Sequence, residues 1–567
     1  MKNSTFSIGV DFGSESGRVI VADVQTGEIM GTHIVPYQHG VITEQLPGTN
    51  ISIPYGSALQ HPQDYLDVLE IGIPCAVAKA NIDAAQIIGL GIDFTASTVL
   101  PVDRDLNPLC FSPQFQNSHH SWVKLWKHHH TKPQTEKIYQ LATQRKEKWL
   151  RRLGYNISEE WAIPKILEVF DDAPELYART TYFIEAVDWI VSLLTSTITR
   201  SNCSLGFKAF WNEQDGFPEE FFYELDPEFG ATIVSKLQGH IKQVGTCAGT
   251  LTKQWAEKLS LPQGLPIATG IIDAHSALLG NGVYQSQTLL MVMGTSTCHL
   301  MVSPELKEIP GISGVVKDSV IPGLYAYEAG QSAVGDLFGA YVNKHIPPAY
   351  VEEADRLGVS VFTLLEAKAE QLSPGENGLI ALDWHNGNRS VLSDADLSGL
   401  LMGLTIHTKP EEIFRAYMES TAFGAKMILN TYQEWGMEIK EVIASGGLPK
   451  RNPLLMQIYA DILDKPIKVA QSEQASAIGA AILGSVAAGG KNGGPSSIIQ
   501  AIQQMASPIE TTYYPNKENT QTYQTLYTMY QTLHNYFGIQ HQHMMRTLKQ
   551  MRSHRDVLQG DGSVGAL

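Results

Sequence analysis

The sequence predicts an α/β protein with two similarly built domains that face each other across a cleft. Its 567 residues are too many for one ordinary core, because domains usually split beyond about 250 to 300 residues. A composition of 43% hydrophobic and 17% charged residues is that of a packed globular protein. A strand, a Gly-rich turn and a second strand occur at residues 6–24 and again, just past the middle of the chain, at residues 289–302. This recurrence indicates two domains of one design; chance repetition of a common motif is the alternative.

The net charge of -17 argues against some classes of binding partner but does not identify one. Nucleic acids and anionic membranes attract clustered Lys and Arg, so we expect neither as a partner. A few backbone amides or one Lys can still hold a phosphate in an acidic protein.

The expected location is the cytoplasm. The N-terminus leaves no room for the apolar core of a signal peptide, and no apolar stretch reaches about 20 residues, so we expect neither export nor membrane insertion. Five cysteines without a C-x-x-C pair predict buried free thiols in a reducing compartment.

Residues 6–24, FSIGVDFGSESGRVIVADV, are the first predicted hairpin. Asp11 ends its first strand, while Gly13 and Gly17 allow backbone conformations that a β-carbon would resist. Such a turn can present amides and hydroxyls to phosphate oxygens, with the Asp11 carboxylate placed to hold Mg²⁺ or its bound water. An ordinary hairpin, whose Asp and Gly only satisfy the turn, explains the segment equally well.

Three later segments add to this pattern. Residues 289–302, LLMVMGTSTCHLMV, repeat the hairpin. In residues 441–451, EVIASGGLPKR, an apolar strand runs into Gly-Gly before a helix that begins near Pro453. The missing side chains would let an adenine or ribose approach the backbone, but the loop lacks P-loop and dinucleotide spacings, so a plain strand-to-helix loop is the alternative. Residues 472–486 predict a small-residue helix that packs closely at a domain junction.

These segments, in this order, resemble the superfamily of sugar kinases, actin and heat-shock chaperones, and within it the FGGY carbohydrate kinases. The resemblance runs from about residue 6 to about residue 535 and is carried by GVDFGSESGR, GIDFTAST, EWAIPKIL, IIDAHSALLG, GTSTCHL, YEAGQSAVGD and LDWHNGNR. It implies two actin-like (RNase H-like) domains, residues 1–285 for the sugar and the catalytic base and residues 286–550 for the nucleotide, which close on their substrates. It also implies that ATP, with Mg²⁺, phosphorylates the 5-hydroxyl of ribulose in the degradation of L-arabinose.

The resemblance implies roles for individual residues. Asp273, which ends an apolar strand in LPIATGIIDAHSALLG, is expected to contact the sugar, to accept the hydroxyl proton and, with Asp11, to hold the metal; a cap for the following helix is the alternative. Asp93 and Ala96 are expected in the wall of the sugar pocket. The expected nucleotide contacts are Gly13, Ser14, Ser16, Arg18, Gly294, Thr295, Ser296, Ser445, Gly446, Gly447 and Asn452.

Two further residues, Lys208 and Glu328, are expected on the sugar hydroxyls, because a polyol site needs polar anchors. A solvated surface lysine and a strand-end ion-pair partner are the alternatives. Three aromatic residues near Lys208 are expected in the core or in a pocket wall, namely Phe207, Phe210 and Trp211.

Three segments have no implied role. His128, His129 and His130 stand where the family pattern has an Asp, and because consecutive residues rarely aim at one ion we expect a solvated loop. Residues 107–260 elaborate the first domain. Residues 555–567 are expected to be disordered.

Other functions stay open at this point. A kinase of the same fold that acts on xylulose, D-ribulose, glycerol or another polyol is the nearest alternative, because pocket side chains decide the substrate. An ATP-dependent binding or chaperone-like protein would keep Asp11 and the Gly-rich loops but would not need Lys208, Glu328 and Asp273 together. An inactive scaffold would leave catalytic positions unfilled. The expected partners are ATP and a small sugar, with a homodimer left open.

Overall fold

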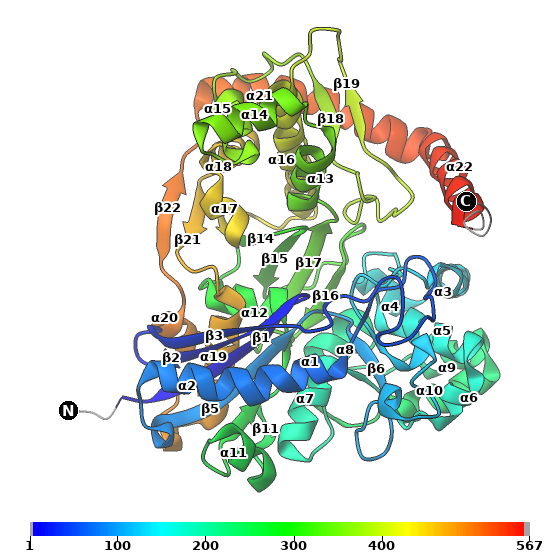
Figure 1. The fold of residues 1–567 in the computed structure, drawn as a ribbon, viewed down its shortest axis with the longest axis vertical. Coiled ribbons are helices and arrows are strands. Elements are labelled where there is room, and N and C mark those ends of the chain that lie inside the picture. The colour runs from blue at the N-terminus through cyan, green and yellow to red at the C-terminus, as the bar shows by residue number, and fades with distance from the viewer. Residues whose placement is uncertain (1–3, 561–567) are drawn as a thin grey trace.

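The structure is a computed structural model that describes the backbone of residues 4–560 and the side chains of residues 4–551. Two sheet-centred halves lie one above the other along the long axis of the molecule (Figure 1). The last helix, α22 (Gln542–Gly560), runs into the start of the tail predicted at 555–567, and the rest of that tail lies outside the described residues.

The first half is built on a sheet of seven strands in the order β11-β12-β5-β1-β2-β3, with β13 also beside β5. β1, β2 and β3 are antiparallel neighbours, whereas β5 and β12 run parallel to β1, and β11 closes the edge antiparallel. The strands are β1 (Phe6–Phe12), β2 (Ser16–Asp23), β3 (Ile29–Pro36), β5 (Ile87–Phe94), β11 (Cys247–Thr250), β12 (Pro266–Ala268) and β13 (Ile271–Ile272).

The second half repeats this order in the sheet β16-β17-β15-β14-β20-β21-β22. Here β14, β15 and β17 are antiparallel, β20 and β21 run parallel to β14, and β22 is antiparallel at the edge. The strands are β14 (Thr288–Met293), β15 (Thr297–Ser303), β16 (Gly314–Lys317), β17 (Tyr325–Gln331), β20 (Glu441–Ser445), β21 (Ile467–Ala470) and β22 (Ile509–Tyr513). The matching order confirms two similarly built α/β domains, with β16 as an addition.

The small-residue helix predicted at 472–486 is α19 (Ala475–Ala488), and it crosses from the second half of the sequence onto the first sheet (Figure 1). Its backbone touches the sheet directly, because a Cβ placed on Gly9 or Gly91 would lie 2.0 Å from Ala477 O or 1.9 Å from Ala480 O. It meets α12 (Asp273–Gly280) as closely, since a Cβ on Gly479 would lie 1.9 Å from Ser276 O. Only glycine fits at such distances, so these residues fix how the halves join.

The remaining first-half elements form two groups. One covers the first sheet and comprises α1 (Pro62–Asp67), α2 (Ile73–Ala80), α7 (Ala186–Thr195) and α11 (Lys253–Leu259). The other is the elaboration, with the sheet β4-β7-β6-β8 and its own aromatic core around Trp149, Phe210 and Phe222. Because α7 and β11 belong to the main domain, whereas β4 and β6 of the elaboration precede residue 107, the elaboration does not coincide with the predicted residues 107–260. Its strands and helices are β4 (Leu59–Gln60), β6 (Val99–Val102), β7 (Val123–Lys124), β8 (Tyr182–Glu185), α3 (Lys132–Arg145), α4 (Lys148–Arg152), α5 (Ala162–Asp172), α6 (Pro174–Arg179), α9 (Glu219–Leu225) and α10 (Pro227–Lys236).

A short link joins these groups, formed by β9 (Thr199–Ser201), α8 (Asn202–Lys208) and β10 (His240–Lys242). Helices cover the second sheet around the long α16 (Pro410–Glu434), whose buried face includes Phe414 and Phe423. The other helices and strands of this half are α13 (Gly335–His345), α14 (Pro348–Leu357), α15 (Val361–Glu370), β18 (Ile380–Leu382), β19 (Leu400–Met402), α17 (Gly447–Arg451), α18 (Pro453–Leu463), α20 (Ile498–Met505) and α21 (Lys517–Asn535). None of the helices in residues 4–560 has the length and apolar character needed to cross a bilayer.

Candidate active site

Three predicted carboxylates meet at the carboxyl ends of neighbouring parallel strands of the first sheet. Asp11 on β1 is in register with Asp93 on β5, and Asp93 in turn pairs with Ile271 on β13, two residues before Asp273. Parallel strands deliver their ends to one edge of a sheet, where α/β proteins bind ligands. The strand-end carboxylates that the sequence singled out therefore form one cluster.

Burial and mutual repulsion favour protonation within this cluster of three carboxyl groups. Burial, followed by the charges of Asp11 and Asp273, raises the pKa of Asp93 well above its usual range. Burial, followed by the charge of Asp11, raises the pKa of Asp273 to about 7. Burial also raises the pKa of Asp11, although Arg18, 3.0 Å away, opposes the shift. Asp273 is thus poised to exchange a proton near neutral pH, as a general base requires.

Asp273 does not act as the ordinary cap of α12. The residue at the cap position is Ile272, and the Asp273 side chain accepts only from the adjacent amide of Ala274, at 2.7 Å. Its carboxylate also lines the cleft. The capping alternative is therefore not what the structure favours.

Lys208 at the end of α8 and Glu328 on β17 form an ion pair between the two halves. The Lys208 Nζ donates to both carboxylate oxygens of Glu328, at 2.8 and 3.0 Å. The two side chains are only 5% and 13% exposed, so Lys208 is not a solvated surface lysine. Glu328 is an ion-pair partner, as its alternative had it, but it lies within β17 (Tyr325–Gln331) rather than at the end of the strand. Burial opposes ionisation of Glu328, but Lys208 outweighs it and lowers the pKa of this carboxyl.

The two Gly-rich turns are both closed by a backbone hydrogen bond, but they differ in length. The amide of Gly13 donates to Ser16 O, three residues on, at 3.0 Å, and that of Gly294 donates to Ser296 O, two residues on, at 2.9 Å. Four residues separate the last strand pair Phe12–Gly17 of the β1–β2 hairpin, and three separate Met293–Thr297 of the β14–β15 hairpin. The hairpin is thus repeated in both halves, with a turn that is one residue shorter in the second.

Both turns line one cleft of about 1770 Å³, and most of the predicted sugar-site residues line it too. Asp11 and Asp93 lie beneath its surface, with Asp93 fully buried. The predicted residues that line the cleft are Gly13, Ser14, Ala96, Lys208, Asp273, Gly294, Thr295, Ser296 and Glu328.

The third Gly-rich loop lies at the same sheet edge but outside the cleft lining. Ser445 is in register with Val292 at the end of β14, and a Cβ on Gly446 would lie 2.4 Å from Met293 O. Asn452 caps α18 by accepting from the amide of Leu455 at 2.9 Å. Arg18, Ser16 and Gly447 likewise do not line the cleft. Nucleotide contacts at these positions stay predictions.

Two sequence expectations about side chains hold only in part. His129 and His130 are 40% and 35% exposed, but His128 is fully buried, because it and His130 contact the buried carboxylate of Glu168 on α5, at 3.1 and 2.8 Å. The cysteines are free as predicted, but only two are buried; Cys247 is exposed because β11 is an edge strand, and the others, Cys75 and Cys298, are partly exposed.

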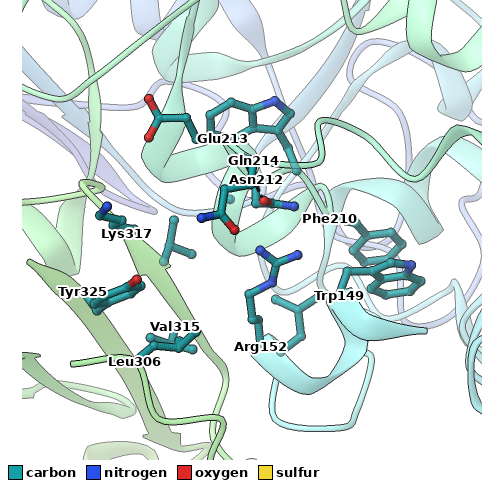
Figure 2. Close-up of a pocket in the computed structure, with 14 residues that line it drawn as sticks. Trp149, Arg152, Phe210, Asn212, Glu213, Gln214, Leu306, Val315, Lys317 and Tyr325 are labelled. Atoms are coloured by element: carbon teal, nitrogen blue, oxygen red, sulfur yellow. Dashed lines mark hydrogen bonds between the residues drawn. The ribbon is translucent and has the colours of Figure 1, made fainter. Parts of the chain in front are cut away.

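A second, smaller pocket of about 180 Å³ lies beside the cleft, between α4 and α8 of the first half and β16 and β17 of the second (Figure 2). Phe210 stacks on Trp149 in its wall, at 4.4 Å between ring centres, and Trp211 also lines it. The prediction that Phe207, Phe210 and Trp211 form core or pocket wall is thereby confirmed, with Phe207 fully buried.

Sequence reasoning missed several residues that line the cleft, among them Trp126, Glu160 and Arg389. Glu160 begins EWAIPKIL and Arg389 ends LDWHNGNR, so a charged residue at the end of each of two motifs that carry the resemblance was the available signal. Among the side chains of residues 4–551, no group of three or more His, Cys, Asp and Glu is arranged to hold a metal ion. A Mg²⁺ site at Asp11 and Asp273 stays a prediction.

Residues from both of the similarly built sheets line this cleft, and the chain matches a family of proteins over both halves. Residues 6–280 match the model of the N-terminal domain of the FGGY family of carbohydrate kinases, and residues 289–488 match that of its C-terminal domain. The chain belongs to the FGGY family and is a carbohydrate kinase, a class whose members use ATP.

Individual curated proteins and solved structures show which carbohydrate kinases the chain is similar to. A curated protein of Staphylococcus aureus (strain Newman), named "Ribulokinase", is 48% identical over 548 residues, which cover 97% of this chain and 99% of the relative. Among solved structures, a ligand-bound xylulose kinase from Lactobacillus acidophilus has a TM-score of 0.77 at 18% identity, covering 95% of this chain and 100% of the other. A glycerol kinase from Plasmodium falciparum with ADP has a TM-score of 0.71 at 17% identity, covering 93% and 97%. These two likenesses concern the fold alone.

Proposed function

We propose that this chain is a ribulokinase, which transfers the γ-phosphoryl group of ATP to the 5-hydroxyl of ribulose in the cytoplasm, as a step of L-arabinose degradation. The observation that supports this substrate is the 48% identity, over nearly the full length, to relatives named for ribulose. The structural neighbours that act on xylulose or glycerol share the fold at 18% or 17% identity, and fold does not decide substrate.

The chain's own residues supply the acid–base chemistry. The sugar lies in the cleft against Ala96 and the Lys208–Glu328 pair, with its 5-hydroxyl directed at Asp273. Asp273 accepts the hydroxyl proton while the oxygen attacks the γ-phosphorus in line, and ADP leaves. Burial and the charge of Asp11 raise the pKa of Asp273 to about 7, near the operating pH, where a general base is most effective. Lys208 can donate hydrogen bonds to the sugar hydroxyls and Glu328 can accept hydrogen bonds from them, so the two residues can orient the sugar.

The two hairpins are proposed to hold the triphosphate, with backbone amides of the Ser14 and Thr295 turns directed at its oxygens. A divalent cation fits beside them, since Asp11 and Asp273 offer the oxygen ligands that Mg²⁺ prefers. The charge of Asp11 raises the pKa of Asp273, and a cation would offset that repulsion. When bound, Mg²⁺ would supply charge neutralisation for the phosphoryl group.

The proposal is tested by ADP release with Mg-ATP and a panel of L-ribulose, D-ribulose, xylulose, ribitol and glycerol. The expected result is the highest kcat/KM with a ribulose enantiomer and phosphate on O5 by ³¹P NMR. Preferred turnover of xylulose or glycerol would contradict the substrate, and acceptor-independent ADP release would favour an ATP-dependent binding protein instead. The latter would not explain why Lys208, Glu328 and Asp273 share one cleft.

A further inference from the structure

Two motifs that received no role in catalysis meet across the cleft. EWAIPKIL begins with Glu160, in the first half, and LDWHNGNR ends with Arg389, in the second half. In the structure Arg389 Nη2 donates to Glu160 Oε1 at 2.9 Å. The side chains are 21% and 19% exposed, and both line the cleft, so this is a half-buried ion pair between the domains at the proposed active site.

The backbone of the second half is built to let Arg389 reach this position. A Cβ on Gly330 of β17 would lie 3.0 Å from Arg389 Cδ, so the side chain passes over a strand position that has no side chain of its own. The amide of Gly330 also donates to Ser390 Oγ at 3.1 Å, which anchors the segment. Residues i and i+2 of a strand share a face, so Arg389 crosses β17 directly beside Glu328.

On the first half, Arg389 covers the residues that support the first hairpin. Its guanidinium carbon lies 5.9 Å from the centre of the Trp126 ring, within the range of cation–π attraction. The Trp126 Nε1 donates to Ser14 Oγ at 2.9 Å. A continuous set of contacts therefore runs from β17 through Arg389 and Trp126 to the turn that is proposed to hold phosphate.

The surroundings of Glu160 favour its ionised form, which accepts the hydrogen bond from Arg389. Burial opposes its ionisation, but the Arg389 guanidinium and the hydrogen bond from His129, at 3.0 Å, lower the pKa of this carboxyl. An ionised carboxylate that accepts from Arg makes the stronger, charge-assisted kind of hydrogen bond. The pair therefore keeps its charges throughout the neutral range.

We propose that Arg389 is a positioning residue for the phosphoryl transfer: by binding Glu160 and covering Trp126 across the cleft, it holds the Ser14 turn in register with the acceptor pocket. This inference rests on the proposed function. Arg389 need not touch the reacting atoms. It acts through Trp126 and Ser14, so its loss misplaces the phosphate turn relative to Asp273 without unfolding either half.

The test compares Arg389→Gln, Glu160→Gln and the double variant with a matched control. Lys132→Gln is that control, because the Lys132–Asp396 pair also joins the halves at the cleft but is 48% and 32% exposed, and exposed pairs contribute little. Two readouts are used, kcat/KM for ribulose and the Kd for ATP measured by calorimetry without sugar. The thermal midpoint of each variant reports folding.

The expected result is a loss of roughly 10- to 100-fold in kcat/KM for each single variant, weaker ATP binding, and a Tm near that of the wild type. The double variant loses no more than Arg389→Gln alone, because both changes break one contact. Arg389→Lys recovers part of the activity, since an ammonium restores the charge without the planar fork. Glu160→Gln breaks the same contact with Arg389 still present, and it decides the matter if Arg389→Gln fails to fold.

Activity of Arg389→Gln equal to that of Lys132→Gln would overturn the proposal, as would losses that add fully in the double variant. Wild-type activity in Glu160→Gln would do the same. A wild type without ribulose-dependent ADP release contradicts the proposed function instead, and the ATP affinities of the same variants then decide on Arg389 alone.

Discussion

Replacing Lys208 with Met tests whether the buried ion pair between the halves is structural, functional or both. The substitution keeps an unbranched apolar stem and removes the ammonium that donates to Glu328 at 2.8 and 3.0 Å. Glu328 then keeps only weaker electrostatic partners, namely Arg389 and His275, whose Nε2 lies 3.7 Å away. A buried charge that loses its partner costs about 3 to 5 kcal/mol, or roughly 6 to 20 °C in Tm.

The pH dependence of this loss has a definite sign. Lys208 is the largest of the charges that lower the pKa of Glu328 against the effect of burial, so its loss raises this pKa, and protonation of Glu328 at low pH relieves the folded variant of an incompletely paired charge. The deficit in Tm is therefore smaller at pH 5 than at pH 8. The Lys208→Met/Glu328→Gln double variant recovers most of the stability at pH 8 but none of the kinase activity, because both sugar contacts are gone.

The assay is thermal unfolding by circular dichroism at pH 5 and pH 8, with activity measured in parallel. Lys258→Met is the control, because the Lys258–Glu70 pair is 43% and 37% exposed and such pairs contribute about 0 to 1 kcal/mol. A double variant no more stable than Lys208→Met, or an equal deficit at the two pH values, would refute the reasoning.

Three further predictions concern the base, its titration and the domain junction. Asp273→Asn is expected to fold normally and to lose at least about 10²- to 10⁴-fold in kcat; near-wild-type turnover would remove Asp273 from the mechanism. Because its pKa is raised to about 7, kcat/KM for the acceptor should fall about tenfold per pH unit below 7 and level off above it, whereas a flat profile down to pH 5 contradicts this assignment. Gly91→Ala forces a Cβ to within 1.9 Å of Ala480 O and should cost about 1 to 3 kcal/mol or more. Gly339→Ala, where a Cβ meets no atom within 4 Å, is its control and should keep the wild-type Tm.

The sequence predicted the parts of the fold that local patterns encode. Patterns of Gly and apolar residues predicted the hairpins at 6–24 and 289–302 and the helix at 472–486, because only a few local structures are compatible with such patterns. The strand-end positions of Asp11, Asp93 and Asp273 were likewise visible as a carboxylate after an apolar run. Their assembly into one cluster depends on strand register, which one sequence does not specify.

The sequence did not predict contacts that tertiary packing creates. His128 looked like part of a polar run, yet it is buried because Glu168, forty residues later, needs partners inside the elaboration. Arg389 and Glu160 are 229 residues apart, so no local pattern could join them. The limits of the elaboration were also misjudged, since α7 is apolar enough for either core and only its packing against the first sheet assigns it.

The most direct measurement is a crystal structure of the chain with L-ribulose, Mg²⁺ and a non-hydrolysable ATP analogue. The account predicts a triphosphate lying between the Ser14 and Thr295 turns, with the 5-hydroxyl of the sugar in hydrogen-bonding reach of Asp273. A nucleotide bound away from both turns, or a sugar with no hydroxyl near Asp273, would contradict it.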